Sequence, residues 1–322
     1  MSETINKNNT QFKHSMILLL TALIWGTSFV AQSTGLKLIG PFSFTALRMP
    51  LGAAVLIPFI CAEYHRNKQA FIKHDSKNAS YNLKKLYKDS IYAGIPIGIL
   101  LSIASNLQQL GMLHASAGKA GFITAFYIVL VPIFGIFLHK KTGLITWISV
   151  FTALIGLYYL CIGHSKISNI DIFDIFLLCC AIFFSLHILT VDKIGSRTSG
   201  LVMSATQFII AGLISIPFIF LIDKHLLNMP LTITNISKAA IPIGYSGLLS
   251  CGAAYTLQII GQQGVNPTLA SLIMSLESVT SAIAGFFILN QKLTKDQLTG
   301  CIIMFAAVIL AQLPSKVSFH IS

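Results

Sequence analysis

The sequence IPIG at residues 95–98 occurs a second time at residues 241–244. A second block, IPFI at residues 57–60, returns in the same order at residues 216–219. Two blocks shared in the same order indicate that the chain consists of two copies of one unit. This duplication decides the fold, because each copy must then form the same set of elements.

The match between the copies continues past the IPIG block at a fixed offset of 150 residues. Ten positions within residues 104–137 are identical to their counterparts, and one of them is polar, since Gln108 matches Gln258. A polar match inside apolar surroundings is harder to produce by chance than an apolar one. Apolar composition therefore does not explain the repeat.

The composition places the chain in a membrane. Of its 322 residues, 54% are hydrophobic and only 10% are charged, whereas soluble domains carry about a quarter charged residues. Ten apolar runs are long enough to cross a bilayer as helices, and the alternating pattern of barrel strands is absent. We predict an all-α polytopic membrane protein with ten transmembrane helices. The runs are Ser15–Thr34, Pro41–Ala62, Ser90–Leu113, Ala117–Leu138, Leu144–Gly163, Ile172–Val191, Gly200–Ile222, Ser237–Ile260, Pro267–Leu289 and Gln297–Leu313.

Ten helices in two copies give five helices to each repeat. An odd number forces the second copy to start on the opposite side of the membrane, so the two five-helix repeats are inverted. Inverted repeats are typical of secondary transporters, whose substrate site lies near midplane between the repeats. We assign the first repeat to residues 15–163 and the second to 170–313, with tails at 1–14 and 314–322.

The positive charge of the chain, +12 at pH 7, follows the positive-inside rule rather than indicating nucleic acid. With the N-terminus inside, 14 Lys and Arg residues lie on the cytoplasmic side and 7 on the other. We therefore predict a multi-pass protein of the cell inner (plasma) membrane with both termini cytoplasmic. Half of the 14 lie between spans two and three. We predict a solvated loop there; the alternative is an interfacial helix on anionic lipid headgroups.

Four groups of residues resemble the drug/metabolite transporter superfamily, EamA type. They are Trp25-Gly26 with Phe29, Arg48, the run from Ala117 to Ile123 that leads to Val131-Pro132, and Ser275-Leu276-Glu277. The resemblance covers about Ser15 to Leu313. It implies ten helices in two inverted repeats and, in many members, export of amino acids or related metabolites across the bacterial inner membrane.

Two positions depart from the family pattern. The family commonly has Pro after the Glu of span nine, where this chain has Ser278. It commonly closes that span with Gly-Glu, where this chain has Asn290-Gln291. We therefore expect Glu277 on a straighter helix and no acid at the end of the span.

Charged groups at membrane depth are costly and mark candidate sites. Glu277, near the middle of its span, is a candidate proton-coupling carboxylate or partner of a substrate amine. The alternative is a purely structural role, in which Glu277 is the partner of a cation such as Arg48. Arg48 is a candidate for holding a substrate carboxylate, although pairing with Glu277 is favoured. The repeat equivalent of Arg48 is Gln207, so any site is asymmetric.

The other candidates are polar or aromatic side chains within spans. We expect Asn106, Gln108, Gln109, Tyr255 and Gln258 either to line the cavity with hydrogen-bonding groups or to join helices. Trp25 and Tyr127, with Phe29, are candidate aromatic walls. His187, one turn from the cytoplasmic end of span six, is either a proton relay or an interfacial histidine without function.

The sequence favours a secondary transporter over an enzyme or a channel. It contains no His-Glu-x-x-His, no nucleophile elbow, no Walker A motif and no carbonyl filter sequence. The predicted substrate is a small organic metabolite, most often an amino acid or related compound, moved by alternating access and exported. The alternative is uptake or exchange of a nucleotide-type metabolite, or drug efflux. We expect no cofactor, metal or nucleic acid. The expected partners are a small-molecule substrate and membrane lipid, and the chain is a monomer or homodimer.

Overall fold

The computed structural model describes residues 2–74, 78–115, 117–140, 142–161, 171–195, 198–289 and 293–312. Within these residues every regular element is a helix, in agreement with the predicted class. The helices of the first repeat are α1 (Ser2–Gly35), α2 (Pro41–His74), α3 (Ala79–Gly111), α4 (Ala117–Ala125), α5 (Tyr127–Phe137) and α6 (Leu144–Cys161). Those of the second are α7 (Ile172–Ile194), α8 (Gly200–Phe218), η2 (Ile219–Lys224), α9 (Ile233–Lys238), α10 (Ala240–Tyr245), η3 (Ser246–Tyr255), α11 (Thr256–Gln262), α12 (Pro267–Met274), α13 (Glu277–Leu289) and α14 (Lys295–Ala311).

Each of the ten predicted spans corresponds to one helix or to a stack of consecutive helices. Seven helical segments of the described chain are long and apolar enough to cross a membrane, and α6 contributes a shorter apolar stretch, Leu144–Leu160. The other two spans are the stack α10–η3–α11 and α14, a helix of 17 residues. The repeat boundary at 163–170 and the tail at 314–322 lie outside the described residues.

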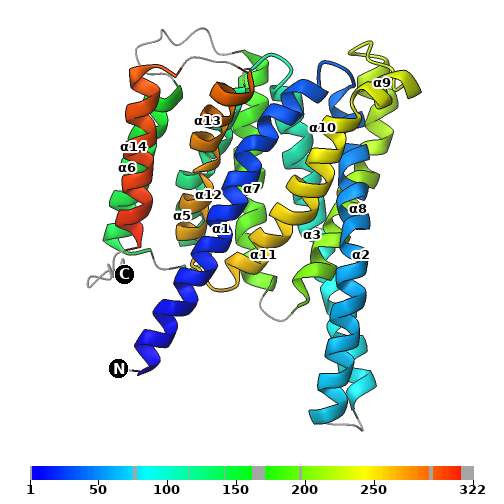
Figure 1. The fold of residues 1–322 in the computed structure, drawn as a ribbon, viewed down its shortest axis with the longest axis vertical. Coiled ribbons are helices and arrows are strands. Elements are labelled where there is room, and N and C mark those ends of the chain that lie inside the picture. Colours follow the sequence, from blue (N-terminus) through cyan, green and yellow to red (C-terminus); the bar gives the residue numbers. More distant parts are fainter. Residues whose placement is uncertain are drawn as a thin grey trace.

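The helices form one bundle in which α1 begins and α14 ends at the same end (Figure 1). The pair α6 and α14 covers one flank, whereas α2, α3 and α8 pack together on the other. Gly156 and Gly300 allow α6 and α14 to cross closely, because a Cβ on Gly300 would lie 2.5 Å from the carbonyl oxygen of Gly156. Small residues at such crossings let helix backbones approach in lipid.

Spans four and nine are interrupted at equivalent points of the two repeats. In span four the amide of Phe126 bonds to the carbonyl of Ile123 at 3.2 Å, an i to i−3 bond that separates α4 from α5. In span nine the amide of Leu276 makes the same bond to Ile273 at 3.2 Å, between α12 and α13. Both partners are shifted by 150 residues, so the duplicated sequence encodes the break twice.

The break in span nine corrects the expectation that Glu277 lies on a straighter helix. Ser278 replaces the family's proline, yet the helix is interrupted just before Glu277. The hydroxyl of Ser275 donates to the carbonyl of Leu272 at 2.7 Å, and that of Ser271 donates to Thr268 at 2.8 Å. Serine hydroxyls that bond to the preceding turn compete with the helical ladder and bend helices. Serines therefore accompany the break where the family commonly has proline.

The connection between spans two and three is helical, which corrects the prediction of a solvated loop. α2 has 34 residues and α3 has 33, so each is about 50 Å long at about 1.5 Å per residue. The hydrocarbon core is only about 30 Å thick, and the two helices project from the bundle as a hairpin (Figure 1). Residues 63–90 contain no Gly or Pro, so nothing in the sequence interrupts the helices at the membrane surface.

Candidate functional site

A buried chamber lies where the two repeats meet. Seven of the nine predicted substrate-site residues line it, and helices of both repeats contribute. The volume that the centre of a water molecule can occupy in it is about 30 Å³. This is room for about two waters. The chamber is therefore narrow in this structure. Its lining is Trp25, Phe29, Gln32, Arg48, Gln108, Thr124, Tyr127, Phe184, Ile188, Ser250, Tyr255, Gln258 and Glu277.

The carboxylate of Glu277 is held by the residue that occupies the same position in the other repeat. The hydroxyl of Tyr127 donates to Oε1 of Glu277 at 3.0 Å, and the two residues are 150 positions apart. Tyr127 is the first residue of α5 and Glu277 the first residue of α13, so both follow the break in their span. The bond therefore joins the two repeats at the axis that relates them.

Arg48 is buried at the chamber, with 1% of its surface exposed. Its Nη1 donates to Oε1 of Gln32 at 3.0 Å, and its guanidinium lies 5.5 Å from the centre of the Phe44 ring. Nε and Nη2 have no hydrogen-bond partner. Among the described residues no ion pair joins Arg48 to Glu277, so the favoured structural pairing is not formed. Two guanidinium nitrogens, Nε and Nη2, are left for another acceptor.

The residue that matches Arg48 in the second repeat is Gln207, and it is bonded to a histidine. Gln207 accepts through Oε1 from Nε2 of His187 at 2.9 Å. His187 is fully buried, and its bond to Gln207 joins α7 to α8. It is also outside the chamber lining. The first repeat thus places a cation at this position, and the second repeat places an uncharged amide there.

Two predicted site residues, Asn106 and Gln109, are buried behind the chamber wall rather than in its lining. Nδ2 of Asn106 donates to Oγ of Ser215 at 2.8 Å, which joins α3 to α8. Nε2 of Gln109 donates to Oε1 of Gln32, the oxygen that also accepts from Arg48. Gln109 therefore acts on the site through Gln32, by fixing the orientation of the amide that holds Arg48.

The matched glutamines line the chamber from two different helices, Gln108 from α3 and Gln258 from α11. Nε2 of Gln108 donates to Oγ1 of Thr124 at 3.4 Å, and Nε2 of Gln258 donates to Oε1 of Gln262 at 3.0 Å. Oε1 of Gln258 is buried without a hydrogen-bond partner. The chamber therefore offers an acceptor besides the carboxylate of Glu277.

Aromatic rings form one wall beside a π-helical segment. The rings of Trp25 and Tyr255 meet edge to face with centroids 4.6 Å apart. Nε1 of Trp25 donates to the carbonyl of Ser250 at 3.4 Å, and Ser250 and Tyr255 both belong to η3. π-Helical turns occur frequently at functional sites. The corresponding part of α3 is regular, which is a second asymmetry between the repeats.

Sequence reasoning did not identify Gln32, Thr124 or Ser250 as members of the site. Gln32 carried a usable signal, since it is an amide inside an apolar span. Thr124 and Ser250 carried none, because short hydroxyl side chains are common in membrane helices, where they bond to the preceding turn.

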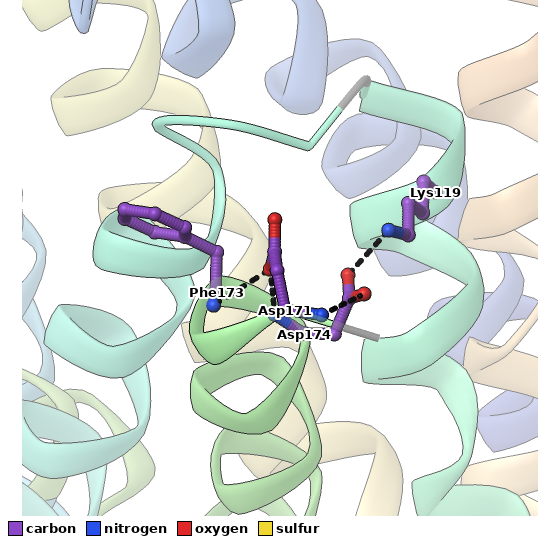
Figure 2. Close-up of polar contacts among 4 residues, drawn as sticks. All are labelled: Lys119, Asp171, Phe173 and Asp174. Atoms are coloured by element: carbon purple, nitrogen blue, oxygen red, sulfur yellow. Dashed lines mark hydrogen bonds and ion pairs between the residues drawn. The ribbon is translucent and has the colours of Figure 1, made fainter. Parts of the chain in front are cut away.

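Two ion pairs join span four to span six, one near each end of α7. Nζ of Lys119 lies 2.6 Å from Oδ1 of Asp174, and Nζ of Lys140 lies 2.5 Å from Oδ2 of Asp192. Figure 2 shows that Asp174 also accepts from the amide of Asp171, the residue that caps α7. Lys141 lies outside the described residues, as do Asn290 and Gln291.

The fold and the chamber define a polytopic helical membrane protein whose two inverted repeats enclose a polar site. Residues 13–162 and 171–313 each match the EamA-like transporter family. The chain therefore belongs to the EamA-like transporter family, within the drug/metabolite transporter superfamily, as its motifs had indicated.

Two relatives agree with this assignment, and a solved structure shares the fold. An "Uncharacterized transporter" of Archaeoglobus fulgidus is 26% identical over 298 residues, which are 92% of this chain and 84% of the relative. The "Uncharacterized transporter YwfM" of Bacillus subtilis is 23% identical over 310 residues, 94% of this chain and 95% of the relative. A crystal structure with 15% sequence identity superposes with a TM-score of 0.70, covering 93% of this chain and 96% of that one.

Proposed function

We propose that this transporter moves small zwitterionic metabolites of the amino-acid type through the central chamber by alternating access. The observation that carries the proposal is the placement of Arg48 and Glu277 in one chamber without an ion pair between them. A buried guanidinium with unused donors suits a carboxylate, with which arginine forms paired hydrogen bonds. A buried carboxylate suits an ammonium group.

A zwitterion provides a carboxylate for Arg48 and an ammonium group for Glu277, which do not form an ion pair with each other. Because an unpaired charge in a low-dielectric site is costly, a ligand with both charges gains on both sides. A ligand with only one of the two groups leaves the other charge unpaired. This difference is the basis of the proposed selectivity.

The small volume of the chamber supports a mechanism in which the repeats must move. Room for about two waters is less than any amino acid needs, so substrate entry requires the chamber to open toward one side. The bond between Tyr127 and Glu277 lies where the repeats meet, and its rearrangement would accompany that opening. Export is the direction that the family resemblance implies.

The alternative substrates fit this lining less well. A nucleotide-type metabolite carries several negative charges, whereas Arg48 is the single Lys or Arg among the residues that line the described chamber. A large drug would need an apolar chamber without a buried ion of each sign. Neither alternative has an observation of its own in its favour.

The test is transport by the purified protein in vesicles with three matched ligands: an amino acid, its decarboxylated amine and its deaminated acid. We expect transport of the amino acid alone, in a direction read from right-side-out and inside-out vesicles. Arg48→Gln keeps a hydrogen-bonding side chain but removes the charge. We expect it to reduce amino-acid transport at least tenfold, since hydrogen bonds to charged groups contribute about 1.5–3 kcal/mol. Gln207→Ala at the matching position, outside the lining, is the control. Equal transport of all three ligands would contradict the proposal.

A further inference from the structure

A groove outside the transport chamber lies on the hairpin formed by α2 and α3. Its volume is about 680 Å³. Tyr64 of α2 and Tyr87 of α3 meet there edge to face, with ring centroids 5.5 Å apart. The groove is lined by Tyr64, Ser80, Leu83, Lys84, Tyr87, Lys88, Ile91 and Tyr92.

Helix length places this groove at the membrane surface. Tyr64 is 23 residues from the first residue of α2, Pro41, and therefore about 35 Å along the axis. Tyr92 is 19 residues before the last residue of α3, Gly111, or about 29 Å. With about 30 Å of hydrocarbon, both tyrosines lie at headgroup level. Tyr and Trp are enriched at that level in membrane proteins.

The groove combines cationic and apolar groups. Lys84 and Lys88 are exposed and lie four residues apart, on one face of α3. Neither forms an ion pair within the described residues, and the Lys88 ammonium lies 5.7 Å from the centre of the Tyr92 ring. Leu83 and Ile91 supply apolar lining beside them. Glu63, the acidic residue next to Tyr64, accepts from the hydroxyl of Ser199 and so has a partner at the start of α8.

We propose that this groove binds one anionic phospholipid. The two ammonium groups contact its phosphate headgroup, and Ile91, about 30 Å along α3 from Gly111, contacts the start of its acyl chains. Charge complementarity at headgroup depth is the argument for a lipid, because basic groups next to membrane spans attract anionic lipids. The site is independent of the transported substrate.

The experiment measures lipid retained by the purified, full-length protein in native mass spectrometry. The lipids are phosphatidylglycerol and phosphatidylcholine with identical acyl chains. We expect the wild type to retain one phosphatidylglycerol in preference to phosphatidylcholine, and Lys84→Gln/Lys88→Gln to bind it about tenfold more weakly. The control Lys68→Gln/Lys85→Gln removes the same charge from the same hairpin but outside the groove lining, and should bind as the wild type does.

Equal losses in both double variants would overturn the proposal, because the attraction would then be a general effect of positive charge. Equal retention of the two lipids would overturn it as well. Inorganic phosphate should not displace the lipid, and displacement at millimolar concentration would mean that the groove is a free-anion site. Circular dichroism of each variant checks that the helical content is unchanged.

Discussion

At the residue scale, the site depends on one hydrogen bond between positions that the duplication made equivalent. Tyr127 and Glu277 are the same position in the two repeats, yet one is a phenol and the other a carboxylic acid. Their 3.0 Å bond joins the repeats at the chamber. Because the two repeats differ at this matched position, one supplies a hydroxyl donor and the other a carboxylate acceptor.

We predict that Glu277→Gln abolishes stimulation of transport by a pH gradient, because an amide cannot bind and release a proton at this position. The measurement is counterflow and gradient-driven uptake in vesicles, with exchange at equal pH as the reference. Tyr127→Phe is the control: it keeps the carboxylate and removes its donor. We expect it to lower the rate about tenfold, in line with about 1.5–3 kcal/mol for a hydrogen bond to a charged group, while the gradient still stimulates transport.

If transport by the Glu277→Gln protein still responds to the gradient, the carboxylate is not the coupling group. It would then serve to bind the substrate ammonium or to hold the two repeats together through Tyr127. A loss of equilibrium exchange together with gradient response would indicate the binding role.

At the element scale, the broken helices bring the site residues to the axis. Span four ends its first half at Ala125 and span nine at Met274, and the side chains that follow the breaks meet in the chamber. α13 is also packed closely on α1. A Cβ on Gly26 would lie 2.4 Å from Cβ of Thr280 and 2.6 Å from the carbonyl oxygen of Glu277. Backbone atoms cannot move aside as a flexible side chain can, so only glycine fits there.

We predict that Gly26→Ala destabilises the protein by about 1–3 kcal/mol, the usual cost of overpacking, because α1 and α13 must separate. Thermal unfolding in detergent measures the effect as a lower midpoint. Gly121→Ala is a matched control on α4, facing the same helix. Its new Cβ would have its nearest contact at 3.9 Å, to Ser278, so we expect little change. Comparable destabilisation by both substitutions would show that close packing on α13 is not the cause.

At the scale of the whole molecule, the five-helix repeat and the position of the helix ends give the topology. The start of α1, the end of α14 and the projecting hairpin of α2 and α3 lie at one end of the bundle, and α9 lies at the other (Figure 1). Half of the positive charge on which the orientation was predicted lies between spans two and three, including Arg66, Lys68 and Lys85 of the hairpin. By the positive-inside rule, we propose that this end faces the cytoplasm.

We predict that a single cysteine at Tyr81 on the hairpin is labelled by an impermeant maleimide only after the cells are opened. A cysteine at Asn228, between η2 and α9, should be labelled in intact cells. Both side-chain positions are at the ends of the bundle, and the native cysteines are first replaced by alanine or serine. Labelling of both sites in intact cells, or of Tyr81→Cys alone, would contradict the proposed orientation.

The sequence by itself determined the ten spans, their duplication, the resulting inversion and the family. Each of these depends on local hydropathy or on matches between segments, and both can be read from linear order. It also identified most of the chamber lining, because buried polar groups stand out inside apolar helices.

Only the tertiary structure decided which of these groups contact each other. Three hydrogen bonds join different helices: Tyr127 with Glu277, Arg48 with Gln32, and His187 with Gln207. In the second of them Arg48 is bonded to an amide rather than to an acid. Such contacts depend on how helices cross and rotate, which hydropathy does not encode. The helical hairpin after span two was missed for a related reason: polarity marked where the membrane ends, but the helix does not end there.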